Sequence, residues 1–298
     1  MKIFDCFMYF DEDLVLDLRL NYLSKYVDKF VIVESKFNHK GEERKLEFDL
    51  NKFVKFKDKI TYIILDKNPE SIEKIKDNDN EIEKNNKFIN NSNKREGFQR
   101  NQILSGLVNA ERNDWVIISD VDEIPNLENI NFSKSKSKLV FFRQDMMYYK
   151  FNLKYNDFKW VGSRACKKKN LISPQWLRNI KVRNYPWWRL DAYFSQLKYL
   201  NIEFIENGGW HFSYIKSAES IEKKLKSYLH HREYDLNPLG IDKINEMIKS
   251  KKAIYNLKHD QKSWNKFGSG EKLTKINFES LPEYINLNKE KYKKWLED

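Results

Sequence analysis

The pattern that most constrains the fold lies in the first 35 residues, where a strand, a helix and a second strand follow one another. Residues 3–10 form a mostly apolar run of strand length, residues 13–25 carry leucines at helical spacing, and residues 30–34 form a second apolar run. Two strands joined by a helix within so short a stretch form a βαβ unit, whose strands lie parallel in one sheet. The sequence therefore predicts an α/β fold with a mixed, mainly parallel central sheet flanked by helices.

Further elements follow this unit. Residues 60–65 and 115–118 are short apolar runs that predict two more strands. Between them, residues 67–95 are rich in Asn, Lys and Glu, a composition that predicts a mobile insertion or lid. We expect a helix to begin at Arg95, and residues 283–296 predict a terminal amphipathic helix.

A cluster of carboxylates follows the strand at 115–118 directly. Because alternate side chains of an extended segment share a face, we expect Asp120 and Asp122 to point the same way, with Val121 turned into the core. Two carboxylates at a strand end suit a hard divalent cation, Mg²⁺ or Mn²⁺, with positions left for water and phosphate oxygens. The carboxyl ends of strands are where α/β sheets bind ligands. We therefore predict a metal–diphosphate site here; the alternative is an ordinary acidic turn.

A histidine far along the chain is a candidate third ligand. His211 follows the pair Gly208-Gly209 and stands between the aromatic residues Trp210 and Phe212. Glycines allow close backbone approach, and imidazole is an acceptable ligand for Mn²⁺. His211 would thus complete the site of the two aspartates, although a lone histidine also commonly serves a structural role.

Two basic positions and one acidic position are candidates for contacts with a bound anion or nucleotide. Glu34 ends the second apolar run, where it would contact a ribose or base, or instead cap the following turn. Arg95 or Arg100 would meet ligand phosphates. The alternative for Arg100 is an ion pair with Glu96, four residues earlier on the same helix face.

The second half of the chain holds candidate bases and sugar-stacking aromatics. A general base must be a carboxylate within reach of the group that it deprotonates. Asp145 and Asp191 are flanked by aromatic residues, and Glu206 lies close before the glycine pair; a hydrogen-bonded turn is the alternative for each aspartate. Aromatic rings bind sugar faces, and the tryptophans placed to do so are Trp160, Trp187 and Trp210.

The composition limits the possible partners and the compartment. The net charge is +11, but the lysines are scattered and no basic helix is evident, so we expect no nucleic-acid partner. The two cysteines, Cys6 and Cys166, lie far apart, which argues against zinc and for reduced thiols. The sequence shows no signal peptide and no apolar run of membrane-spanning length. We therefore expect a soluble, cytoplasmic protein.

The sequence resembles glycosyltransferase family 17 through several motifs in the same order along nearly the whole chain. These are Phe4-Asp5-Cys6-Phe7, Asp11-Glu12, Arg19, residues 27–35, Glu96 with Arg100, Ser119 to Pro125, Gly208 to Ser213, Lys224-Leu225, His230 and Leu281 to Ile285. It differs from the animal members by the Asn-rich stretch 67–95 and by lacking an N-terminal membrane anchor, so we expect other acceptors than theirs.

The resemblance implies a GT-A-like, Rossmann-like fold. It also implies a metal-dependent, inverting transfer of a sugar from a UDP-sugar to a glycan acceptor, and the expected donor is UDP-N-acetylglucosamine. Residues 1–137 would form the nucleotide-sugar-binding half and residues 138–298 the acceptor-binding half of one domain. Asp5 and Arg19 would contact the nucleotide or its phosphates. The cation, Mn²⁺ or Mg²⁺, would bridge the diphosphate.

Two other classes of protein fit parts of the pattern. A metal-dependent phosphohydrolase also uses an Asp-x-Asp pair after a strand, but usually after the first strand and with a hydroxyl residue close behind. A basic protein without enzymatic activity would bind nucleic acid through its positive charge.

Overall fold

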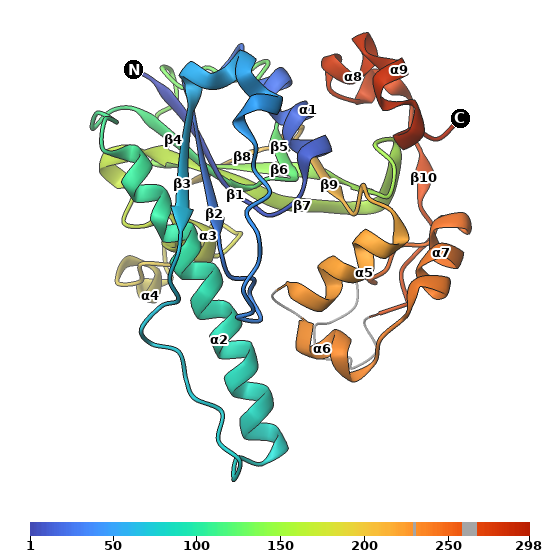
Figure 1. Cartoon of the computed structure of the whole chain (residues 1–298). Coiled ribbons are helices and arrows are strands. Elements are labelled where there is room, and N and C mark those ends of the chain that lie inside the picture. The colour runs from blue at the N-terminus through green and yellow to red at the C-terminus, as the bar shows by residue number, and fades with distance from the viewer. Residues whose placement is uncertain (229–230, 258–266) are drawn as a thin grey trace.

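The centre of the molecule is one mixed sheet (Figure 1). The computed structural model describes residues 1–228, 231–257 and 267–298. The strand order is β3-β2-β1-β4-β7-β6-β9-β5, with β8 added beside β6 and β10 beside β7. Five of the nine pairings between these strands are parallel, which confirms the predicted α/β fold with a mixed sheet flanked by helices.

The parallel strands form the first half of the sheet and the mixed pairings form the second. The first half contains β1 (Ile3–Tyr9), β2 (Lys29–Ser35), β3 (Ile60–Leu65) and β4 (Trp115–Asp120). The second contains β5 (Glu123–Pro125), β6 (Leu139–Tyr148), β7 (Leu153–Lys167), β8 (Ile202–Ile205), β9 (Gly209–Ser213) and β10 (Thr274–Lys275). The four predicted strands of the first half are thus confirmed.

Alternation along the buried strands creates a core on each face of the sheet. In β2, Phe30 and Ile32 point to one face, while Val31 and Val33 point to the other. The first face is covered by α1 (Asp13–Leu23), α8 (Glu283–Leu287) and α9 (Lys289–Tyr292). The second face is covered by α2 (Glu81–Asn101), the 3₁₀ helix η2 (Gln102–Leu107) and α3 (Pro174–Asn179). The sheet is therefore packed on both faces.

A third apolar cluster lies beside the mixed half of the sheet. It joins the ends of β6 and β7 to α5 (Ala218–Ser227), α6 (His231–Leu236) and α7 (Ile241–Lys249). These helices stand apart from α3 in Figure 1, whereas α6 contacts α2. His230, one of the residues that carried the family resemblance, lies outside the described residues.

The polar stretch 67–95 differs from its prediction, because much of it belongs to helix α2. The helix begins at Glu81, where Asn80 and Glu83 form a reciprocal capping box. Ser92 is fully buried, and its hydroxyl lies 3.2 Å from His231 of α6. The stretch therefore forms a capped helix in spite of its low hydrophobicity, because the helix packs against α6 through polar contacts.

The C-terminal segment also departs from its prediction. Instead of one helix over 283–296, the chain forms α8, α9 and the 3₁₀ turn η5 (Lys293–Trp295), because Asn288 has non-helical dihedral angles. Among the described residues, no helix combines the length and apolar character needed to cross a membrane.

We predict that two glycine-to-alanine changes have opposite effects. A Cβ at Gly106 would lie 2.4 Å from the stiff, buried Val31 side chain, so Gly106→Ala should lower the free energy of unfolding by about 1–3 kcal/mol. A Cβ at Gly97, inside α2, would meet Gln175 at an ordinary 3.4 Å. Gly97→Ala should therefore stabilise the protein by up to about 1 kcal/mol. Urea unfolding of both variants tests this, and equal effects would contradict the packing described here.

Candidate active site

The turn that joins β4 to β5 is held from below by a buried arginine. Arg19 of α1 donates from Nε and Nη2 to the carboxylate of Asp5 on β1, at 2.8 and 2.5 Å. Its Nη1 donates to the backbone carbonyls of Asp120, Val121 and Glu123, at 3.1, 3.2 and 2.7 Å. Asp5 and Arg19 have no exposed surface. The structure therefore places these two residues, predicted to contact the nucleotide, beneath the turn, where they fix its backbone.

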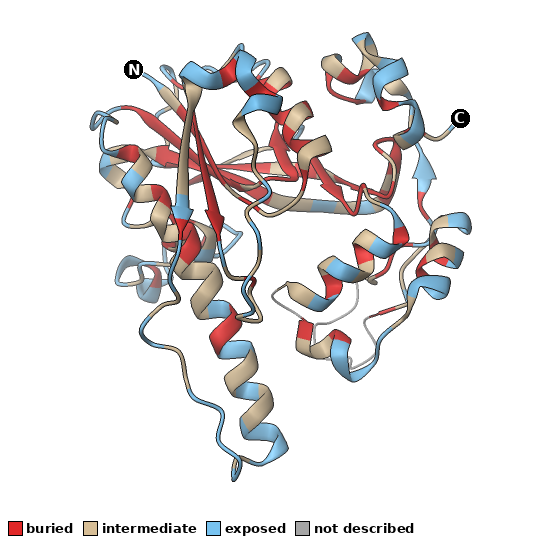
Figure 2. Cartoon of the chain, viewed as in Figure 1, coloured by how far each residue is buried: buried red, intermediate tan, exposed pale blue. Residues whose placement is uncertain are grey.

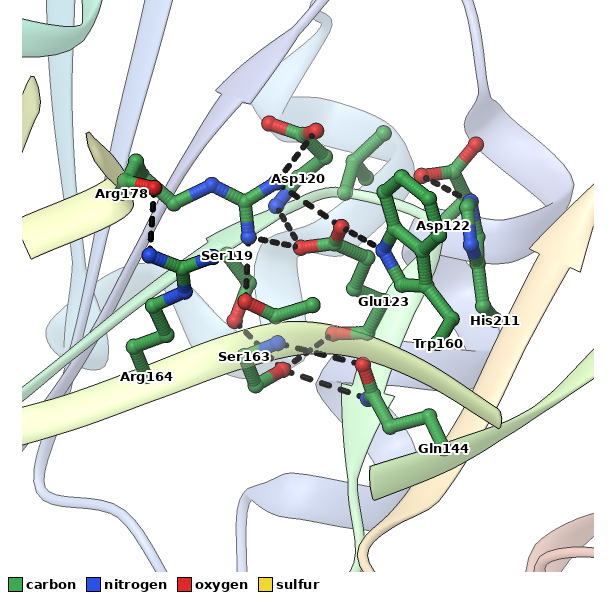
Figure 3. A network of polar contacts seen from close by, with 12 residues as sticks. Ser119, Asp120, Asp122, Glu123, Gln144, Trp160, Ser163, Arg164, Arg178 and His211 are labelled. Atoms are coloured by element: carbon green, nitrogen blue, oxygen red, sulfur yellow. Dashed lines mark hydrogen bonds and ion pairs between the residues drawn. The ribbon is translucent and has the colours of Figure 1, made fainter. Parts of the chain in front are cut away.

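Glu123 connects the turn to one side chain of helix α3 and one of strand β7 (Figure 3). Its carboxylate accepts two hydrogen bonds from Arg178, at 2.7 and 2.9 Å, and one from the indole N–H of Trp160 at 2.6 Å. It also accepts a hydrogen bond from the backbone N–H of Asp120 at 2.8 Å. Gly162 is needed here, since a Cβ would lie 2.5 Å from the Glu123 carboxylate carbon. Glu123 thus positions a cation and an aromatic ring beside Asp120.

Asp120 faces two guanidinium groups. Its carboxylate oxygens accept one hydrogen bond each from Arg100, at 2.9 Å, and Arg178, at 3.0 Å. Burial raises the pKa of Asp120, but the guanidiniums outweigh it and lower the pKa to about 2. Arg100 also pairs with Glu96 at 2.8 Å, so the predicted pair on α2 is confirmed and extended to the turn.

Asp122 faces a different set of partners. One carboxylate oxygen lies 3.5 Å from Nε2 of His211, and the other lies 3.4 Å from the ammonium of Lys224. Burial raises the pKa of Asp122, but Lys224 and His211 hold it well below its usual range. The two aspartates therefore turn to different partners, contrary to the prediction of a shared direction, while Val121 between them is buried in the core as expected.

The fit of a divalent cation depends on Asp122 and His211. Their 3.5 Å separation exceeds an ordinary hydrogen bond of about 2.9–3.0 Å, and Nε2 also lies 3.3 Å from the hydroxyl of Ser213. The other ring nitrogen, Nδ1, is buried and has no hydrogen-bond partner among the described residues, and an ion on Nε2 would leave that cost in place. Among the described residues, however, no group of three His, Cys, Asp or Glu side chains is arranged as a metal site. Asp122 and His211 could thus serve as two ligands of an ion, whereas the carboxylate of Asp120 is paired with Arg100 and Arg178.

Two cavities flank the turn. The first, about 330 Å³, lies between the start of α1 and the segment after β9, and its lining includes Glu12, Asp122, Lys216 and Lys224. The second, about 390 Å³, lies between α2, β7 and α3, and its lining includes Arg100, Trp160, Arg164 and Arg178. Each aspartate of the turn thus has cationic groups of one cavity as its partners.

Two further residues, Glu34 and Arg95, were predicted to contact a ligand and in the structure make hydrogen bonds that anchor the loop after β2. Glu34 is fully buried and accepts hydrogen bonds from Arg44 (2.9 Å), from Tyr62 (2.7 Å) and from the backbone N–H groups of Glu47 and Phe48. Arg95 donates to Asn68 at 2.9 Å and to the carbonyl of His39 at 3.2 Å. The contacts of Glu34 match the turn-capping alternative considered from the sequence.

The predicted aromatic residues lie in three different environments. Trp160 lines the second cavity, and its ring centroid is 5.3 Å from that of His211. Trp210 is packed in the core, where its indole donates to the carbonyl of Ser280 and its ring meets Tyr22 edge-on. Trp187 is 73% exposed on the segment between α3 and β8. Of these tryptophans, the contacts place Trp160 at the turn.

The three candidate bases are all ion-paired. Asp145 of β6 contacts Lys154 and Lys159 at 2.8 and 2.7 Å, and these lysines hold its pKa below the usual value against the opposing effect of burial. Asp191 and Glu206 form exposed pairs, Asp191 with Arg189 and Lys198, and Glu206 with Arg143. Asp145 lies opposite Trp210, the neighbour of His211, in the pairing of β6 with β9. Among the three candidates, Asp145 thus lies on a strand paired with β9, where it faces the same side as Trp210 and the opposite side from His211.

Sequence reasoning missed the residues that compensate the carboxylates. Arg178 lies 55 positions after Glu123 on α3, and nothing in its local sequence signals the contact. Lys224 and Glu12, which lie 3.2 Å apart, appeared only within the family motifs. Helical spacing would have placed Lys224 one turn after the buried Ile221, a usable but weak signal.

We predict that Glu123→Gln destabilises the fold. The substituted amide would turn an N–H₂ donor toward Arg178, Trp160 or the Asp120 N–H, which are themselves donors. Loss of a buried ion pair costs about 3–5 kcal/mol of the free energy of unfolding. The matched change Glu206→Gln, at an exposed pair, should cost less than about 1 kcal/mol. Similar midpoints of urea unfolding for the two variants would contradict the role of Glu123.

We also predict the titration of His211 in the metal-free protein. Burial lowers its pKa, but Asp122 outweighs burial and raises it above the ordinary value of 6.5. Stability from this pair is therefore complete below the pKa of an unfolded histidine and is lost as the pH rises through the folded value. Asp122→Asn should lower the pKa of His211 in an NMR titration, while His231, whose pKa burial lowers, should not move. An unchanged His211 would refute the coupling.

Comparison with known proteins gives the chain its family. No curated protein matches it. The model of glycosyltransferase family 17 matches residues 1–297, essentially the whole chain, in agreement with the resemblance found in the motifs. The family carries an activity, the transfer of a sugar, and such enzymes bind a nucleotide sugar and a glycan acceptor. The chain belongs to glycosyltransferase family 17 and is a glycosyltransferase.

Proposed function

We propose that this glycosyltransferase transfers a sugar from a UDP-sugar to a glycan acceptor, with inversion at the anomeric carbon and with a divalent cation. The proposal rests chiefly on the turn 120–123. This turn follows strand β4 and lies between two cavities that are lined by lysine and arginine side chains. The run of parallel strands that ends at Asp120 is what a GT-A-like nucleotide-sugar fold requires. The choice of UDP-N-acetylglucosamine follows from the family resemblance alone.

The cations beside the turn suit the diphosphate of the donor. Lys216 and Lys224 line the cavity of Asp122, and Arg100, Arg164 and Arg178 line the other cavity. Guanidinium groups donate in pairs to phosphate oxygens, and ammonium groups act as point charges. Because Arg100 and Arg178 are already held by carboxylates, little rearrangement is needed when a phosphate arrives.

Asp122 and His211 would hold the cation, Mn²⁺ or Mg²⁺. Bound there, the ion would supply Lewis-acid stabilisation of the charge that develops on the leaving diphosphate. Lys224 would neutralise the remaining charge of Asp122, since it lies 3.4 Å from that carboxylate. Asp120 would hold Arg100 and Arg178 in place; a ligand role for Asp120, expected from its sequence, stays a prediction.

A base on the acceptor side must take the proton of the attacking hydroxyl. We assign this role to Asp145, whose partner Lys159 lines the same cavity as Trp160. Trp160, fixed by Glu123, would offer its ring to a sugar face. Two lysines keep the Asp145 carboxylate ionised, which is the form that accepts a proton, and the same lysines lower its basicity.

We predict that Asp122→Asn abolishes donor turnover while the protein stays folded. The change keeps the side-chain size but removes the negative charge that faces His211 and Lys224. Release of UDP from a panel of UDP-sugars, measured with Mn²⁺ or Mg²⁺, should fall at least about 100-fold. The exposed change Asp191→Asn is the matched control for substitution of a paired aspartate. Wild-type turnover in Asp122→Asn would refute the assignment of the site.

The base is tested separately. Asp145→Asn should lower kcat for transfer to an acceptor by about 10²–10⁴-fold and leave the KM of the donor unchanged. Glu206→Gln, which removes an exposed ion pair, should keep kcat near the wild-type value. The reverse ranking of these variants would assign the base to Glu206 and reject Asp145.

A further inference from the structure

The segment between α3 and β8 exposes an unusual set of apolar side chains. Within the described part of the chain, the exposed aromatic residues all lie here, and they are Trp187, Trp188, Tyr193 and Phe194. Phe194 is 90% exposed, and Leu190 of the short helix α4 (Leu190–Tyr193) is 72% exposed. Figure 2 shows α4 and its neighbouring loops largely in the colour of exposed residues, at the opposite side from α5 to α9. We call residues 181–198 the aromatic segment.

The aromatic segment is anchored to the body of the molecule. Tyr185 and Ala192 are buried, and the backbone of Tyr185 donates to the carbonyl of Tyr199 at 2.9 Å. The Asn184 side chain exchanges hydrogen bonds with the backbone of Ile202, at 3.0 and 2.6 Å. The exposed rings therefore project from a fixed base, so their exposure does not result from a loose tail.

Positive charge surrounds these rings. The aromatic segment contains four basic residues and a single acidic one, Asp191, which gives it a net charge of +3. Arg183, Arg189 and Lys198 all lie over the ring of Tyr185, with distances of 4.5, 5.8 and 5.7 Å to its centroid. The segment thus combines a projecting apolar tip with a cationic base.

We propose that the aromatic segment docks this protein onto the surface of an anionic lipid bilayer. Tryptophan and tyrosine prefer the headgroup layer, where one part of the ring is apolar and the other is wet. Exposed Leu and Phe side chains reach the acyl boundary, and Arg and Lys are attracted to anionic headgroups. The proposal is peripheral binding and needs no spanning helix.

Two other occupants fit the segment less well. A sugar platform needs rings that share one plane, but the rings of Trp187 and Trp188 stand at 85° to each other. A second copy of the chain, docked through the same patch, would bring two surfaces of charge +3 together. An anionic bilayer satisfies both the apolar tip and the positive base.

Docking would also orient the enzyme. Val182 belongs to the aromatic segment and lines the second cavity, together with Asn179 and Arg178. A bilayer against the segment would therefore lie close to the mouth of that cavity. This orientation makes no use of the proposed base or metal, so it is independent of the proposed function.

The test is flotation of the full chain with lipid vesicles. We expect binding to phosphatidylcholine vesicles that contain phosphatidylglycerol, weaker binding to pure phosphatidylcholine, and a loss of binding as salt is raised. The triple variant Trp187→Ser/Trp188→Ser/Phe194→Ser should reduce vesicle binding at least about tenfold. The control Val54→Ser/Val108→Ser/Leu287→Ser removes equally exposed apolar side chains elsewhere and should bind like wild type. Circular dichroism checks that each variant is folded.

A second measurement does not depend on disruptive changes. Doxyl-labelled lipids should quench the tryptophan fluorescence of the wild-type protein, and the conservative variant Trp187→Phe/Trp188→Phe should keep vesicle binding but lose most of the quenching. Unchanged vesicle binding by the triple variant would overturn the proposal. So would a variant that loses only self-association, or only glycan binding, with vesicle binding intact.

Discussion

The contact on which the candidate site most depends is the buried guanidinium of Arg19. It joins α1 to β1 through Asp5, and it holds the carbonyls of Asp120, Val121 and Glu123. An arginine suits this position because its planar fork places five donors in fixed directions. A buried carbonyl without a partner would cost about 1–3 kcal/mol, and this one side chain satisfies three of them. The turn is therefore rigid before any ligand binds.

The rigid turn explains how neighbouring carboxylates serve different roles. Asp120 is directed to Arg100 and Arg178, whereas Asp122 is directed to His211 and Lys224. Each carboxylate forms ion pairs with cationic side chains from elements distant in sequence. The site therefore holds many charges close together, and neither aspartate is buried without a partner of opposite charge. A diphosphate that arrives between the two cavities would meet cations whose positions are already fixed, which is the preorganisation that favours charge stabilisation.

The sequence predicted the parallel half of the sheet well and the polar contacts poorly. The strands β1 to β4 are short apolar runs within the sheet, and α1 carries leucines at helical spacing, so both were visible in the sequence. Helix α2 was predicted to start late, since its first turns are polar and dock through Ser92 and Asn91, although the capping pair Asn80 and Glu83 was present in the sequence.

The site itself was only partly predictable for a related reason. Asp120, Asp122 and His211 were identified from local pattern, and the pairing of Glu123 with His211 across β5 and β9 brings the three near one another. The partners that set their directions come from α2, α3 and α5. Such contacts join charged residues that are distant in sequence. They leave no periodic signal in the sequence, because each helix contributes only one side chain to them.

We propose above all that the Asp122 side of the turn binds the metal-linked diphosphate of a UDP-sugar. Calorimetric titration of UDP, with and without Mn²⁺, tests it most directly. We predict that UDP binds to the wild-type protein only with the cation present and that Asp122→Asn loses this binding. Equal UDP binding without a cation, or wild-type binding by Asp122→Asn, would contradict the claim.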